Sequence, residues 1–145
     1  DEISEKVTHW LEWFGITEKR NTLCKDLSKG QRQKVMLAGA FIHNPKLLFL
    51  DEPFVNLDPI YQRKCRNLLM EIVADGGTIF LCTHILEVAE RVCTRVAVID
   101  RGHVLAAGTI DELKINSDET LEDVFIRLVG ASFDEIEAME GSEEE

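Results

Sequence analysis

Two neighbouring carboxylates at the end of an apolar run are the residues best suited to chemistry. Leu47–Leu50 is continuously apolar, lies between Pro45 and Pro53, and is followed directly by Asp51 and Glu52. Mg²⁺ prefers oxygen ligands and keeps much of its water, so a strand-end Asp can hold it directly or through water. An adjacent carboxylate can orient and deprotonate an attacking water. The pair predicts phosphate hydrolysis, although an ordinary strand that meets solvent at Asp-Glu gives the same pattern.

Two helix starts and one histidine add weaker signals for phosphate chemistry. Ser28 suits the N-cap of a following helix, and Gly30 would let a phosphate approach the backbone closely. Asp58 and Pro59 form a second cap with Pro at the first helical position. His84 follows a strand candidate and could hydrogen-bond a phosphate or the attacking water. Capping alone accounts for both helix starts, and a lone His is more often structural, so each cluster is weak by itself.

The hydrophobic pattern predicts the elements that must position these residues. Helical periodicity predicts helices over 3–14, closed by Gly15, and over 29–42, 59–74, 85–92 and 121–129. Short apolar runs predict buried strands at 47–50, 78–82 and 96–99, with a short terminal strand at 104–107. This alternation is typical of an α/β layer with parallel strands, whose chemistry gathers at the carboxyl ends. Asp51-Glu52 and Thr83-His84 follow two of these ends.

Composition bounds the functional classes. The chain has 145 residues, a length that suits one domain, and 16 basic against 27 acidic residues give a net charge of −11. No basic face for nucleic acid is visible, and no apolar run could span a bilayer. The four cysteines form no C-x-x-C pair, which favours free thiols in a reducing compartment. The run of acids without a base from Asp134 to Glu145 predicts a solvated tail over residues 133–145.

Taken in order, these clusters resemble the ATP-binding cassette (ABC) ATPases. Leu27–Gln31 is similar to the signature motif of that family, and Leu47–Glu52 to its Walker B strand with the catalytic Glu. Asn56–Asp58 is similar to the D-loop, and His84 to the switch histidine. Lys29 departs from the pattern, which more often has Gly, and adds positive charge near the expected phosphate.

The C-terminal third extends the resemblance to transporters. The stretch Gly102–Leu113 is typical of transporter cassettes, and Leu121–Gly130 is similar to the end of cassettes from exporter branches. The resemblance implies an ATP-binding subunit that couples ATP hydrolysis to export through a separate permease. It therefore places the protein on the cytoplasmic face of a membrane.

The implied fold is the C-terminal part of a P-loop NTPase (RecA-like) cassette, α/β, with a mostly parallel sheet flanked by helices. A partial cassette would cover residues 1–132, with part of the helical signature subdomain at 1–44 and the Walker B to C-terminal-helix region at 45–132.

The resemblance also assigns roles. Glu52 and His84 would be catalytic, and Asp51 would hold Mg²⁺ directly or through water. The resemblance implies that two cassettes pair, and that the signature residues of one contact the ATP held by the other. Here the signature residues are Ser28, Lys29, Gly30 and Gln31. Asp58, in the D-loop, would lie at the interface between the two cassettes. The implied cofactors are ATP and Mg²⁺. The implied partners are a second cassette, identical or different, and a transmembrane permease, but no nucleic acid.

The phosphate cradle of the family, G-x-x-x-x-G-K-[ST], does not occur in these residues, since none of the nine Gly is followed by Lys. We therefore expect a C-terminal part of a cassette whose N-terminal half is a further partner, and an isolated chain that hydrolyses ATP negligibly. Such a chain would also expose strand edges and apolar faces. The alternatives are a non-catalytic docking or ATP-sensing module, and a soluble ABC ATPase outside transport.

Overall fold

Contacts within the chain divide it into two units, residues 1–84 and residues 85–145. The computed structural model describes the backbone of residues 1–141 and the side chains of residues 1–131.

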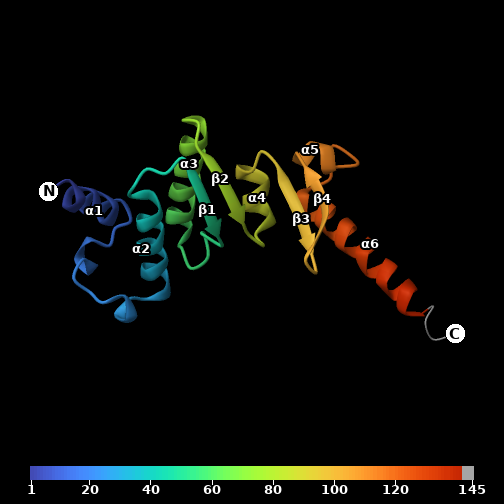
Figure 1. Cartoon of the computed structure of the whole chain (residues 1–145), viewed down its shortest axis with the longest axis horizontal. Helices are drawn as coiled ribbons and strands as arrows, with labels where there is room; N and C mark the ends of the chain where they lie inside the picture. Colours follow the sequence, from blue (N-terminus) through green and yellow to red (C-terminus); the bar gives the residue numbers. More distant parts are fainter. Residues whose placement is uncertain (142–145) are drawn as a thin grey trace. The chain divides into compact units, whose positions relative to one another are not determined.

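The first unit holds three helices and a pair of strands (Figure 1): α1 (Glu2–Trp13), α2 (Lys29–Phe41), β1 (Leu47–Asp51), α3 (Pro59–Ala74) and β2 (Thr78–Cys82). Two short 3-10 turns, η1 (Thr17–Lys19) and η2 (Cys24–Asp26), connect α1 to α2. The predicted helices and strands of this unit are confirmed to within two residues. Gly15, with φ +62°, follows α1, since glycine adopts this left-handed conformation without steric cost.

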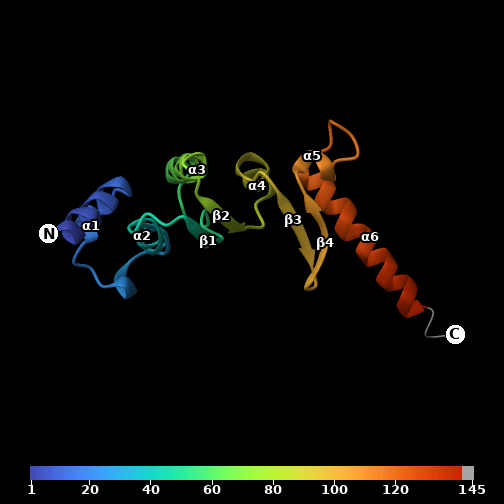
Figure 2. The same cartoon turned by 45° about the horizontal axis from the view of Figure 1, so that its top comes forward.

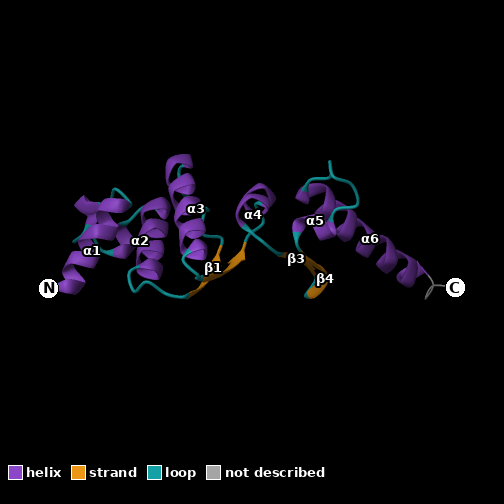
Figure 3. Cartoon of the chain, turned by 90° about the horizontal axis from the view of Figure 1, so that it is seen from above, coloured by secondary structure: helices purple, strands orange, loops and turns teal. Residues whose placement is uncertain are grey.

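The two strands pair in parallel, with Leu47 opposite Thr78 and Asp51 opposite Cys82. α3 connects them and packs on β2, as a parallel crossover requires. Figure 3 shows α2 and α3 on the same side of this strand pair. Leu48 and Leu50 are buried.

The opposite face of this strand pair is bare, which corrects the expectation of strands buried on both faces. Leu47, Phe49 and Phe80 are 53%, 72% and 61% exposed, and the two Phe rings lie 5.8 Å apart. The reason is that no described element of this unit covers that face. The exposed apolar face is, however, what we expect of part of a cassette.

The core of the first unit is aromatic. The Trp10 ring lies 5.3 Å from the Phe41 ring, which joins α1 to α2, and Phe14 and Phe54 are almost completely buried. The Lys64 ammonium of α3 donates a 2.7 Å hydrogen bond to the Trp13 carbonyl at the end of α1. These contacts give α2 and the segment after β1 a fixed scaffold.

The second unit, seen from another angle in Figure 2, contains α4 (Leu86–Val92), β3 (Val96–Asp100), β4 (His103–Gly108), α5 (Ile110–Leu113) and α6 (Leu121–Gly141). β3 pairs antiparallel with β4, so the chain has a parallel pair and a separate hairpin within an α/β fold. The loop between Asp100 and His103 consists of Arg101 and Gly102 with φ of +46° and +81°. Positive φ at both positions suits a tight two-residue hairpin turn.

α6 is longer than the sequence predicts. The expected end was near Val129, whereas the helix continues to Gly141 and includes residues 133–141 of the expected acidic tail. The added segment contains three Glu, two Ala and one Met, which are good helix formers despite the charge. Residues 142–145 of that tail lie outside the described part. Among the described residues, no helix is both long and apolar enough to cross a membrane.

Candidate functional site

The carboxyl ends of β1 and β2 bring Glu52 and His84 together, as predicted. The parallel register pairs Asp51 with Cys82, so the residues that follow each strand meet at one edge. The backbone N–H of Glu52 donates to the Cys82 carbonyl at 2.9 Å, which extends the pairing by one step. This edge is the candidate site.

The Glu52 carboxylate is held through both of its oxygens. The Thr83 hydroxyl donates to Oε2 at 3.0 Å, and the His84 N–H donates to Oε1 at 2.7 Å. The His84 ring nitrogen Nδ1 lies 2.5 Å from the same Oε1. The Glu52 side chain is one-third exposed and that of His84 mostly exposed, so the carboxylate is oriented yet open to water. The strand-end position of Thr83 was visible in the sequence, but its contact with Glu52 was not.

These contacts favour the ionised form of Glu52. Partial burial alone would raise the pKa of the carboxyl. The hydrogen bonds from the His84 ring, the His84 N–H and the Thr83 hydroxyl outweigh burial, so the pKa of Glu52 lies below its ordinary value. An ionised carboxylate offers about four lone-pair positions, and the bonds already made leave room for a water. Glu52 can therefore act as a proton acceptor near neutral pH.

The backbone of Glu52 is also unusual. Its φ is +45°, the left-handed region that non-glycine residues rarely adopt and that costs about 1–3 kcal/mol. The Gln33 side chain, from α2, donates to the Pro53 carbonyl at 3.1 Å and lies 3.5 Å from the Glu52 carbonyl. Sequence reasoning missed Gln33. The one sequence feature that could have identified Gln33 is its position three residues after Gly30, which places both residues on one face of the helix.

Asp51 ends β1 with an exposed side chain. The described residues contain no cluster of three or more His, Cys, Asp or Glu that could enclose a metal ion. Mg²⁺ characteristically takes one or two carboxylates and fills its other positions with water and phosphate oxygens. The lone donor Asp51 beside Glu52 fits such a magnesium ion and does not fit a metal held entirely by protein.

The start of α2 is a complete capping box. Ser28 Oγ accepts from the Gln31 N–H at 3.2 Å, and Gln31 Oε1 accepts from the Ser28 N–H at 3.1 Å. Helical geometry provides no acceptor for the N–H groups of Lys29 and Gly30, which remain at the helix start. A Cβ added to Gly30 would lie 2.7 Å from the Asn56 carbonyl oxygen. Packing against Asn56 therefore explains the glycine at position 30, in addition to the close approach of a phosphate that the sequence predicts.

Asp58 caps α3. Its Oδ1 accepts from the N–H groups of Ile60 and Tyr61 at 3.1 and 3.2 Å. The Lys34 ammonium lies 3.8 Å from Oδ2 and 3.3 Å from the centre of the Tyr61 ring. Partial burial lowers the pKa of Lys34, and the Asp58 charge opposes this shift. The capping interpretation of Asp58 thus holds, and its role between cassettes remains a prediction.

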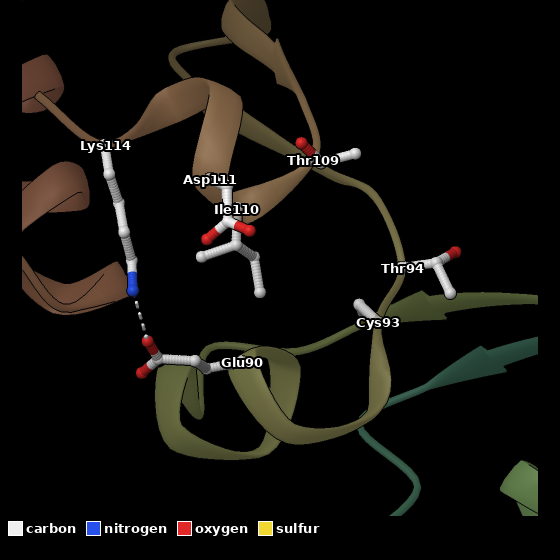
Figure 4. A pocket seen from close by; sticks show the side chains of 7 residues that line it. All are labelled: Glu90, Cys93, Thr94, Thr109, Ile110, Asp111 and Lys114. Carbon is white, nitrogen blue, oxygen red and sulfur yellow. Dashed lines mark hydrogen bonds and ion pairs between the residues drawn. The ribbon is translucent and has the colours of Figure 1, made fainter. Parts of the chain in front are cut away.

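A hollow of about 500 Å³ opens in the second unit beside α4 and α5 (Figure 4). An ion pair of 3.3 Å between Lys114 and Glu90 lies at its wall, and Cys93 also lines it. None of the predicted site residues line this hollow. It therefore shares no lining residue with the candidate site.

Known proteins resemble this chain in sequence and fold. The family described as ABC transporter matches residues 2–55, which include the segments 27–31 and 47–52. An uncharacterized ABC transporter ATP-binding protein of Methanocaldococcus jannaschii is 38% identical over 113 residues, 78% of this chain and 43% of that protein. The methionine import ATP-binding protein MetN of Haemophilus influenzae is 41% identical over 126 residues, 86% of this chain and 36% of MetN.

A solved structure supports the same relationship. The ATP-binding subunit of an ABC transporter superposes with a TM-score of 0.79 at 31% identity, covering 88% of this chain and 55% of that one. The chain thus spans about two fifths of the length of the curated relatives described above. Because the name of MetN specifies import, the expectation of an exporter branch from Leu121–Gly130 is not supported.

Proposed function

Because this chain belongs to the ABC transporter ATP-binding cassette family, we propose that it supplies the signature, Walker B and switch-histidine part of a transport ATPase. The observation that carries the proposal is the Glu52 carboxylate, held by Thr83 and His84 at the carboxyl end of a parallel strand pair. A carboxylate so placed can take a proton from water that attacks a phosphate. The proposed reaction is ATP hydrolysis coupled to transport through a separate permease.

The proposed mechanism follows from the contacts of the site. Glu52 accepts the proton of the attacking water, and His84 holds Glu52 and lies exposed where it can contact the terminal phosphate. Asp51 would hold Mg²⁺, which when bound supplies positive charge beside the phosphate oxygens. The backbone N–H groups at the start of α2, with Ser28 and Lys29, would bind the phosphates of ATP held by a second cassette.

The proposed assembly has three partners. A second cassette, identical or different, would face the start of α2 and the Asp58 turn. A permease would keep the protein peripheral on the cytoplasmic face of a membrane. The remaining part of the cassette would supply the phosphate cradle and cover the bare face formed by Leu47, Phe49 and Phe80. Removing that face from water would stabilise the strand pair.

Glu52→Gln tests the proposed reaction in a cassette that contains these residues together with a phosphate cradle. The variant keeps the size of the side chain and removes its ability to take a proton. We expect ATP turnover to fall roughly 10²–10⁴-fold while ATP still binds. Glu87→Gln, on an exposed position of α4, is the matched control and should leave turnover unchanged. Turnover that survives Glu52→Gln would refute the assigned general base.

A non-catalytic docking or ATP-sensing module is the second candidate, because these residues contain no phosphate cradle. Mixing the chain with a separately produced N-terminal half of a cassette separates the two candidates. A split enzyme regains ATP turnover on mixing. A docking module binds its partner and gains none.

A further inference from the structure

One face of α2 contacts the segment that follows β1 at successive points. Gly30 approaches the Asn56 carbonyl so closely that a Cβ would be 2.7 Å from its oxygen. Gln33 reaches the Pro53 carbonyl, and Lys34 lies 3.8 Å from Asp58. Residues at i, i+3 and i+4 share one helix face, so these contacts form a continuous surface. The start of α2 and the segment 52–58 are thus packed directly on each other.

Gln33 is the residue of this face that reaches the backbone of the catalytic segment. Its Nε2 donates to the Pro53 carbonyl at 3.1 Å, with a longer contact of 3.5 Å to the Glu52 carbonyl. Pro53 is a buried residue and its bond to Gln33 is partly buried, so water is a poor substitute for the Gln33 donor. Gln33 supplies that donor from a different element. The bond therefore fixes the Pro53–Phe54 peptide, and the 3.5 Å contact links Gln33 to the Glu52–Pro53 peptide itself.

The conformation of Glu52 requires such external support. Its left-handed φ of +45° persists only where surrounding contacts hold it. The Glu52 N–H donates to the Cys82 carbonyl on one side. On the other side Gln33 donates to the Pro53 carbonyl and contacts the Glu52 carbonyl. Without Gln33, the Glu52–Pro53 peptide could relax toward a more common conformation. The carboxylate would then lose its alignment with Thr83 and His84.

We propose that Gln33 is a positioning residue that holds Glu52 in its left-handed turn and thereby couples the start of α2 to the placement of the general base. The inference rests on the proposed function and deepens it. Phosphate bound at the start of α2 would act on Glu52 through this bond. Gln33 acts through the backbone beside Glu52 and touches neither the attacking water nor the phosphates.

The test uses a cassette that contains this chain and compares three variants. Gln33→Met keeps the length of the side chain but removes the donor, and Gln33→Lys restores a donor of similar reach. Gln62→Met is the matched control, because the hydrogen bonds that the structure describes for Gln62 go to the Phe54 and Leu57 carbonyls of the same segment and not to Glu52. Each protein is assayed for ATP turnover and for amide hydrogen exchange.

We expect Gln33→Met to lower kcat by roughly 10–100-fold with KM for ATP within about threefold of the unchanged protein, because a misplaced catalytic group slows chemistry. Gln33→Lys should recover most of the loss, and Gln62→Met should keep kcat near normal. Exchange should accelerate at the Glu52 and His84 amides in Gln33→Met only. An unchanged kcat in Gln33→Met, or an equal loss in Gln62→Met, would overturn the proposal.

The amide exchange also separates this inference from the proposed function. If the unchanged cassette hydrolyses no ATP, the proposed function fails, and the exchange at Glu52 and His84 still decides whether Gln33 holds the turn. If turnover is normal and exchange at those amides is unaffected by Gln33→Met, the positioning role alone is wrong.

Discussion

Replacing Gly30 with Ala should destabilise the chain relative to the same replacement at Gly39. Both glycines lie in α2, so each Ala reduces the conformational freedom of the unfolded chain and favours helix by up to about 1 kcal/mol. At Gly39 nothing lies within 4 Å of an added Cβ. At Gly30 the added carbon would be 2.7 Å from the Asn56 carbonyl oxygen, which is backbone and cannot rotate away.

The size of the effect follows from these two terms. Overpacking against backbone costs about 1–3 kcal/mol, which equals or exceeds the helical gain. We therefore expect Gly39→Ala to raise the free energy of unfolding by about 0.5–1 kcal/mol, and Gly30→Ala to lower it by up to about 2 kcal/mol. Urea unfolding followed by circular dichroism measures both, with the slope m unchanged if the denatured state is unaffected.

The comparison can refute the reasoning directly. If Gly30→Ala stabilises the chain as much as Gly39→Ala does, the close approach between α2 and Asn56 does not exist in solution. The surface between α2 and the segment 52–58, which supports the proposed role of Gln33, would then lack its contact at Gly30.

Three further predictions concern ATP turnover, self-association and the dependence of stability on pH. The isolated chain should show ATP turnover indistinguishable from background, and robust turnover abolished by Glu52→Gln would contradict this. Phe49→Ser together with Phe80→Ser should reduce self-association, seen by light scattering, with little loss of stability, because both rings are mostly exposed. At acid pH the Glu119–Arg127 pair should weaken: the hydrogen bonds from the Arg127 guanidinium and the Ile115 N–H hold the pKa of Glu119 below 4.5. The stabilisation they give is complete above pH 4.5 and is lost as the pH falls through the lowered pKa; Glu119→Gln should flatten this part of the pH profile of unfolding.

The sequence predicted features that depend on neighbouring residues. The caps at Ser28 and Asp58 and the break at Gly15 were confirmed, because each is determined within a few positions along the chain. The meeting of Glu52 and His84 was also predictable, since the carboxyl ends of adjacent parallel strands share an edge. These features need only periodicity, caps and one rule of sheet geometry.

Features that depend on distant contacts were not predictable from the pattern. Phe49 reads as a core residue in an apolar run, yet its exposure depends on whether another element covers that face. In the sequence Gln33 is an ordinary polar residue of a helix, and only the fold shows that its side chain bonds to the Pro53 carbonyl. The C-terminal end of α6 was not predictable from the pattern either. The run of acidic residues predicted a solvated tail, whereas the helix propensity of the same residues is sufficient to continue α6 to Gly141.

The geometry distinguishes residues that the fold itself explains from those that it does not. Ser28 and Asp58 make the hydrogen bonds that any helix start requires, so their presence alone says little about function. Glu52 is different, because a strand that simply meets solvent needs neither a left-handed backbone nor a carboxylate bound through both oxygens. Such strain persists only where the surroundings impose it, and it is concentrated at functional sites. The strained conformation of Glu52 therefore argues for the proposed catalytic role more strongly than the sequence pattern around it.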